Sequence, residues 1–76
     1  MKIAVLGSGM VGRAIALDLV KDFDVTSFDL QEQQLQLLQQ KNPAIKIVKA
    51  DLQKHSKYES LLSPFDLVVS AVPGFM

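Results

Sequence analysis

The chain has 76 residues, with eight basic and eight acidic side chains, one histidine and no cysteine. The balanced charge gives no electrostatic reason to expect a nucleic acid or an anionic membrane as partner. The lack of cysteine excludes a disulfide framework, and a hydrophobic share of 49% excludes an intrinsically disordered chain. No apolar stretch approaches the roughly 20 residues that cross a bilayer. We therefore expect one small globular domain in the cytoplasm, with neither nucleic-acid nor membrane partners.

Apolar periodicity divides the chain into strands that alternate with helices. The predicted elements are strand 2–6, helix 10–21, strand 24–29, helix 31–41, strand 45–50, helix 56–62 and strand 66–72. This alternation is typical of an α/β domain with a parallel sheet. Right-handed crossovers, together with a ligand-binding loop after the first strand, favour the spatial strand order 3-2-1-4.

The fourth predicted strand carries the apolar run 67–69, which is typical of a strand buried on both faces. A complete nucleotide-binding sheet of this type has two halves. The chain supplies one half and the first strand of the second half, and it ends at Met76. We therefore expect residues 1–76 to be an incomplete domain, the amino-terminal part of a longer protein.

A glycine-rich motif, G-x-G-x-x-G, directly follows the first predicted strand and opens the first helix. In a Rossmann-type fold the first glycine permits a tight turn, the second lets a pyrophosphate approach the backbone, and the third allows close packing of helix on strand. Free amides at the start of the helix, aided by the helix dipole, then bind the phosphates. The cofactor-binding residues that the motif predicts are Gly7, Ser8, Gly9, Met10, Val11 and Gly12.

Asp29 lies 22 residues after Gly7, at the end of the second predicted strand. This spacing is typical of a carboxylate that accepts hydrogen bonds from the adenosine ribose hydroxyls of a dinucleotide. A 2′-phosphate at the same place would meet like charge, and residues 30–40 contain no basic side chain. The sequence therefore predicts NAD as cofactor, in preference to NADP. A structural alternative for Asp29 is a helix N-cap, a role compatible with ribose binding.

Two further pairs of residues are predicted to lie near the cofactor. Asp51 and Leu52 follow the third strand, where an aspartate can bind the adenine amino group and a leucine can pack on the ring; a surface turn is the alternative. Ala71 and Val72 end the fourth strand beside the glycine loop, near the ribose and pyrophosphate. His55 has no acid, nucleophile or second ligand near it in sequence. We predict neither a catalytic residue nor a metal site.

Residues 1–14, the pair 51–52 and the segment 70–75 (Ser-Ala-Val-Pro-Gly-Phe) resemble the start of saccharopine dehydrogenase-like proteins, a family that includes saccharopine reductase and lysine 6-dehydrogenase. The resemblance implies the first half of an NAD(P)-binding domain in an oxidoreductase. It implies hydride transfer on an amino-acid-derived amine, with the substrate-binding and catalytic residues beyond Met76. We therefore expect this chain to be inactive on its own.

Three other classes share parts of the pattern. Regulatory nucleotide-binding domains of potassium-transport systems resemble the same opening and sense nucleotides without catalysis, although the segment 73–75 speaks against them. Methyltransferases usually carry an acidic residue where Val5 stands, and flavin-binding domains usually carry glutamate where Asp29 stands. The potassium-transport class is the main alternative.

The fourth strand has a further consequence if the chain ends soon after it. Its apolar side chains then form an exposed sheet edge, which is a template for pairing with another chain. We expect self-association through residues 67–72.

Overall fold

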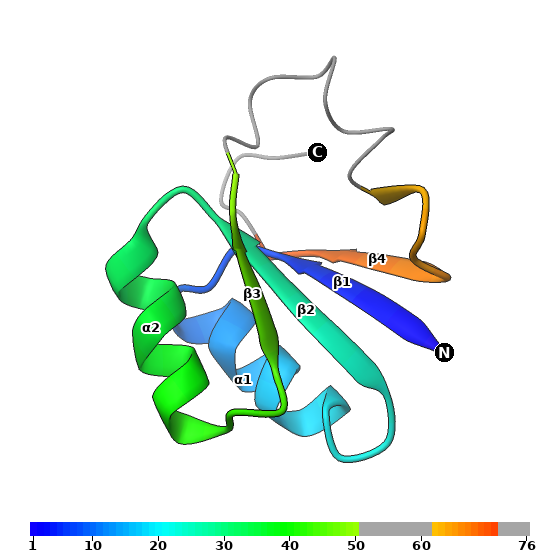
Figure 1. Ribbon diagram of the computed structural model, residues 1–76, viewed down its shortest axis with the longest axis horizontal. Coiled ribbons are helices and arrows are strands. Elements are labelled where there is room, and N and C mark those ends of the chain that lie inside the picture. The colour runs from blue at the N-terminus through cyan, green and yellow to red at the C-terminus, as the bar shows by residue number, and fades with distance from the viewer. Residues whose placement is uncertain (51–61, 72–76) are drawn as a thin grey trace.

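The computed structural model describes residues 1–50 and 62–71. Its secondary structure comprises β1 (Lys2–Leu6), α1 (Met10–Leu19), β2 (Asp24–Asp29), α2 (Glu32–Lys41), β3 (Lys46–Lys49) and β4 (Leu67–Ser70) (Figure 1). The four strands form one parallel sheet in the order β3-β2-β1-β4. The predicted Rossmann-like α/β class and the strand order 3-2-1-4 are therefore confirmed.

Both helices pack on one face of the sheet, and the strands lie in front of them in Figure 1. Because successive side chains of a strand point to opposite faces, alternate residues of β1 and β2 meet the helices. The buried residues of this core are Ile3, Val5, Ala16, Val25, Leu38 and Ile45. Burial of one large apolar side chain stabilises the fold by roughly 1.5–3 kcal/mol. The main core therefore lies between the sheet and its two helices.

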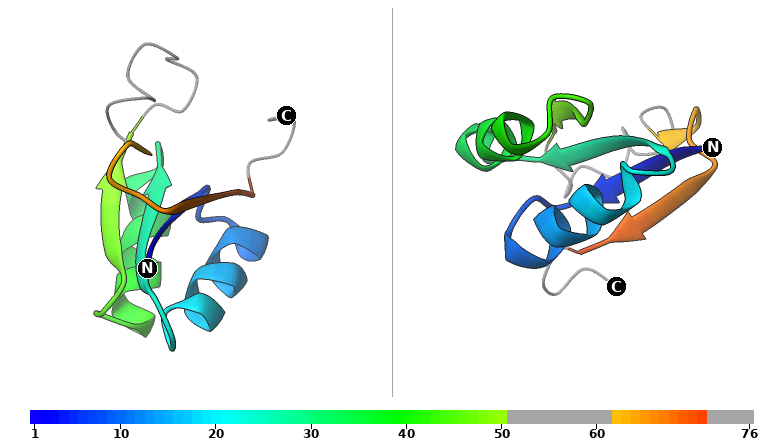
Figure 2. Two further views of the ribbon diagram at one scale, coloured as in Figure 1. Left: turned by 90° about the vertical axis from the view of Figure 1, so that its right-hand side faces the viewer. Right: turned by 90° about the horizontal axis from the view of Figure 1, so that it is seen from below.

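The opposite face of the sheet carries a second, smaller core. Ala4, Leu6 and Phe28 are buried there against Leu62 and Phe65. The rings of Phe28 and Phe65 meet edge to face, with centroids 5.5 Å apart. Residues 62–65, directly before β4, therefore lie on the sheet face opposite the two helices. In the right-hand view of Figure 2, α1 accordingly lies on one side of β1, and the segment that precedes β4 lies on the other side.

The observed elements match the prediction most closely at the start of the chain. β1 and β2 have the predicted bounds. α1 ends at Leu19, two residues early, because the amides of Asp22 and Phe23 both donate to the Leu19 carbonyl and turn the chain toward β2. Most of the helix predicted over 56–62 lies outside the described residues, and Leu62 is helical.

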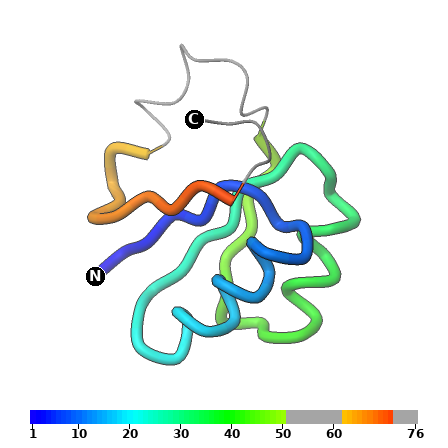
Figure 3. The backbone as a smooth tube through the Cα atoms, turned by 180° about the vertical axis from the view of Figure 1, so that it is seen from behind, coloured from blue at the N-terminus to red at the C-terminus, as the bar shows by residue number. Residues whose placement is uncertain are grey.

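β4 lies alongside β1 at the edge of the sheet (Figure 3). It is shorter than predicted, and Leu67 and Val68 are 48% and 41% exposed. The prediction that the run 67–69 is buried on both faces is therefore wrong for this structure. The physical reason is that no described strand pairs with the outer side of β4.

Helix length also bears on membrane association. Each helix has ten residues, whereas a bilayer span needs about 20. Within residues 1–50 and 62–71, no helix is long and apolar enough to cross a membrane.

Candidate functional site

The loop between β1 and α1 begins with a turn that only glycine adopts readily. Gly7 has a φ of 100°, in the region where a side chain would strain the backbone. Its amide donates to the Phe28 carbonyl at 2.7 Å, which joins the loop to the end of β2. The turn therefore directs the chain out of the sheet and into α1 at the carboxyl ends of the strands.

Gly12, in the first turn of α1, is in direct backbone contact with this loop. A Cβ atom at Gly12 would lie 2.1 Å from the Gly7 carbonyl oxygen and 3.4 Å from the Ala71 Cβ. The amide of Ala71 donates to the Leu6 carbonyl at 2.8 Å. The end of β4 therefore lies against both the glycine loop and the start of α1.

Gly9 differs from Gly12 because it faces open space. A Cβ atom at Gly9 would meet nothing within 4 Å. Gly9 is the N-cap of α1, where no side chain caps the helix and no acidic residue lies in the first turn. The first amides of a helix lack carbonyl partners within it, and they carry the positive end of the helix dipole. The space in front of Gly9, Met10 and Val11 therefore suits a phosphate group.

Asp29 lies beside this space and is bonded to the glycine loop. Its Oδ2 accepts hydrogen bonds from the Ser8 amide at 2.7 Å and from the Ser8 hydroxyl at 2.9 Å. Its Oδ1 accepts from the Gln31 amide at 2.9 Å. The N-cap position of α2 is occupied by Gln31, so Asp29 binds the N-cap residue and is not the N-cap itself.

The environment of Asp29 favours the charged carboxylate. Partial burial raises its pKa, but the hydrogen bonds from the Gln31 amide, from both donors of Ser8 and from the Leu30 amide together outweigh that effect. The pKa of Asp29 consequently lies below the ordinary value for aspartate. At neutral pH the site therefore presents a negative charge beside the positive end of α1.

Exposed apolar side chains surround the charged part of the site. Met10 and Val11 are 82% and 64% exposed, and Leu30, directly after Asp29, is 55% exposed. The sequence analysis did not predict a role for Leu30, although a residue directly after the end of β2 is expected to lie near the cofactor. Sequence reasoning also missed the bonds between Ser8 and Asp29, because they depend on side-chain geometry.

Of the other four predicted site residues, one lies within the described ranges and three lie outside them. The structure brings Ala71 to the glycine loop, as the contacts above describe. Asp51, Leu52 and Val72 lie outside the described residues. Among residues 1–50 and 62–71, no group of three or more potential metal ligands occurs.

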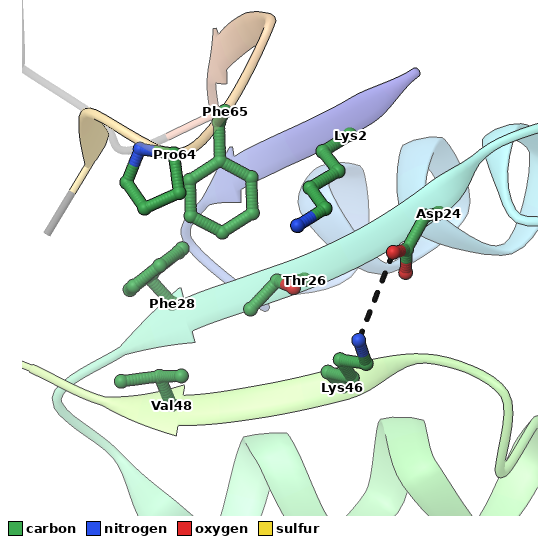
Figure 4. Close-up of a pocket in the computed structure, with 8 residues that line it drawn as sticks. All are labelled: Lys2, Asp24, Thr26, Phe28, Lys46, Val48, Pro64 and Phe65. Carbon is green, nitrogen blue, oxygen red and sulfur yellow. Dashed lines mark ion pairs between the residues drawn. The ribbon is translucent and has the colours of Figure 1, made fainter.

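A separate groove of about 270 Å³ lies on the sheet face opposite the helices (Figure 4). Phe28, Val48 and Phe65 line its apolar part. At the amino ends of the strands, Lys46 Nζ lies 3.7 Å from Asp24 Oδ2. This groove lacks the glycine loop, so the candidate binding site lies elsewhere, at the carboxyl ends of β1, β2 and β4.

Comparisons with known proteins agree with this geometry. Among curated proteins, none matches the chain. A solved structure, apo histidine-tagged saccharopine dehydrogenase (L-Glu forming) from Saccharomyces cerevisiae, is similar with a TM-score of 0.80 and 27% sequence identity. The similarity covers 95% of this chain and 16% of that chain. The family described as "Saccharopine dehydrogenase NADP binding domain" matches residues 3–76. The chain therefore belongs to the saccharopine dehydrogenase NADP-binding domain family.

Proposed function

We propose that this chain binds NAD as the dinucleotide-binding part of an oxidoreductase. The observation that carries the proposal is the position of the Asp29 carboxylate beside the uncapped amino end of α1. A phosphate would bind at the helix end, and a ribose hydroxyl would donate to Asp29. NAD, when bound, would supply the hydride acceptor.

Each part of the dinucleotide has proposed partners in the chain. The amides of Gly9, Met10 and Val11 bind the pyrophosphate, and Leu30 offers an apolar surface beside the ribose. Ala71 approaches the phosphate-binding loop from β4. Of the residues outside the described ranges, Asp51 and Leu52 stay predicted adenine contacts, and Val72 stays a predicted neighbour of the ribose.

The preference for NAD over NADP rests on charge. The family description names NADP, yet Asp29 places a carboxylate where a 2′-phosphate would lie. Two like charges about 5 Å apart repel by roughly 1–3 kcal/mol near a protein surface. Lys49 on β3 is the register partner of Asp29, and its charge would offset part of this repulsion if NADP were preferred.

The test is a ligand-observed NMR competition among NAD, NADP, ATP and S-adenosylmethionine, with circular dichroism to verify folding. We expect NAD to bind more tightly than NADP, by about tenfold or more. The Asp29→Ala variant loses this preference because the repulsion is gone. Preferred binding of NADP that disappears in Lys49→Ala would overturn the NAD assignment. Preferred binding of ATP or S-adenosylmethionine would overturn the assignment of the chain to a dehydrogenase.

We propose the substrate class from the family relationship. The similar yeast enzyme is a saccharopine dehydrogenase that forms L-Glu, which supports hydride transfer on an amino-acid-derived amine. The chain spans 16% of the length of that enzyme, and we propose that the chain binds cofactor without catalysing turnover itself. In the NMR samples, reduction of NAD by an added amino acid would contradict this part of the proposal.

We also propose that the chain self-associates through β4. Among the described strands, β4 lies at the edge of the sheet, and Leu67 and Val68 leave apolar surface beside that edge. An unprotected edge of this kind pairs readily with another strand.

A further inference from the structure

We propose that Ser8 is a positioning residue that fixes the Asp29 carboxylate and thereby sets the discrimination between NAD and NADP. The inference rests on the proposed function and assigns Ser8 an indirect role in it. Ser8 donates twice to Asp29 Oδ2, through its amide at 2.7 Å and its hydroxyl at 2.9 Å. Ser8 is also completely buried, so its hydroxyl cannot reach a ligand directly.

The hydrogen bonds to Asp29 make its two carboxylate oxygens unequal. An ionised carboxylate has about four lone-pair sites, two on each oxygen. The two donors of Ser8 occupy both sites of Oδ2, and the Gln31 amide occupies one site of Oδ1. Oδ1, which accepts no bond from Ser8, is therefore the oxygen that meets a ribose hydroxyl in this proposal.

A carboxylate held in this way discriminates against NADP because its side chain cannot rotate away from a 2′-phosphate. Rotation of Asp29 away from a 2′-phosphate would break both bonds from Ser8, one of them to a hydroxyl that is buried and has no solvent to replace its partner. An alanine at position 8 keeps the amide bond and removes the hydroxyl bond. Asp29 would then rotate more freely, bind the ribose less well and repel NADP less strongly.

The chain offers a matched control for this experiment. Ser8 and Ser27 are both completely buried, but the Ser27 hydroxyl has no hydrogen-bond partner among the described residues. Ser27→Ala therefore removes a buried hydroxyl from the same small domain without touching Asp29. Neither substitution changes the charged side chains at this end of the neighbouring elements, which include Arg13 on α1, Glu32 on α2 and Lys49 on β3.

Two readouts are needed, one without cofactor and one with it. In the free chain, carboxyl-carbon NMR should show a higher pKa for Asp29 in Ser8→Ala and an unchanged pKa in Ser27→Ala. In the competition with cofactors, Ser8→Ala should weaken NAD binding about tenfold, the effect of losing one hydrogen bond to a charged group. NADP binding should weaken less, so that the NAD:NADP affinity ratio falls, while Ser27→Ala keeps the wild-type ratio.

The outcomes separate the positioning role from the proposed function. An unchanged Asp29 pKa in Ser8→Ala overturns the positioning role, whether or not a dinucleotide binds. A raised pKa with an unchanged NAD:NADP ratio also overturns it and leaves NAD binding intact. If the wild-type chain binds no dinucleotide, the proposed function fails, and the role of Ser8 in discrimination fails with it. A raised pKa together with a lowered ratio supports both.

Discussion

The three glycines of the loop between β1 and α1 lack side chains for three different physical reasons. Gly7 adopts a left-handed conformation, with a φ of 100°. Gly12 has no room, because a Cβ atom would lie 2.1 Å from the Gly7 carbonyl oxygen. Gly9 has ample room for a side chain, so the fold itself does not require a glycine there, in keeping with the phosphate position that we propose. The loop therefore separates two glycines that the fold requires from one for which we propose a role in binding.

This separation predicts opposite behaviour for two alanine variants. Gly12→Ala should lower the free energy of unfolding by about 2–3 kcal/mol, because the new methyl group overlaps backbone atoms that cannot move independently. Gly9→Ala should change stability by less than about 1 kcal/mol and weaken dinucleotide binding at least tenfold, because the methyl group occupies the proposed phosphate space. Urea denaturation and the NMR competition measure the two effects. Unimpaired binding in Gly9→Ala would contradict the proposed phosphate position.

At the scale of secondary structure, Asp29 connects three elements that are distant in sequence. It ends β2, accepts two bonds from the loop after β1 and accepts one bond from the residue before α2. Bonds from donors to a charged group contribute about 1.5–3 kcal/mol each when they are buried, and less where solvent screens them, as at this partly exposed site. The carboxylate therefore stabilises the mutual arrangement of the elements that form the site.

The charge of Asp29 predicts a pH dependence of stability. The pKa of Asp29 is lower in the folded chain than in the unfolded chain, where aspartate has a pKa of about 3.9. The unfolded state thus binds the proton more tightly than the folded state does. The stabilising contribution of the Asp29 carboxylate is therefore fully present above the unfolded-state pKa, and it is lost as the pH falls through the folded-state pKa. We expect the stability difference between wild type and Asp29→Asn to shrink between about pH 7 and about pH 3. Urea denaturation at both pH values measures it, and a constant difference would contradict the prediction.

The sequence predicted the elements better than it predicted their contacts. The alternation of strands and helices, with the constraint of right-handed crossovers, was enough for the strand order. The bounds of β1 and β2 followed from apolar runs that end at Gly7 and at Asp29. By contrast, the bonds between Ser8 and Asp29 join residues 21 positions apart, and no local pattern encodes them. The exposure of Leu67 was missed because burial depends on what covers a strand, which its own composition does not specify.

At the scale of the whole molecule, the two faces of the sheet are covered unequally. Two helices cover one face, whereas the described part of the other face packs against Leu62 and Phe65 beside an open groove. In the part of the chain that the structure describes, no strand pairs with the outer edge of β4, and Val68 is exposed there. Among the described residues, β4 is therefore where exposed apolar side chains lie along an unpaired strand, away from α2.

A charge on β4 should suppress the proposed self-association. In Val68→Lys the ammonium group makes pairing between copies costly, as lysines on natural edge strands do. Leu37→Lys is the matched control, because Leu37 is exposed to a similar extent, 46% against 41%, but lies on α2. Light scattering over a range of concentrations should show oligomers for wild type and Leu37→Lys and a monomer for Val68→Lys. A monomeric wild type at high concentration would contradict the proposal.

The direction of β1 has a practical consequence for these experiments. Met1 is exposed and precedes β1, whereas the glycine loop follows the other end of the same strand (Figure 1). Five residues of strand separate the two, a distance of roughly 16 Å. An affinity handle or a fluorescent dye attached at Met1 would therefore project away from the nucleotide, so that the chain can be immobilised or labelled while the carboxyl ends of its strands stay accessible.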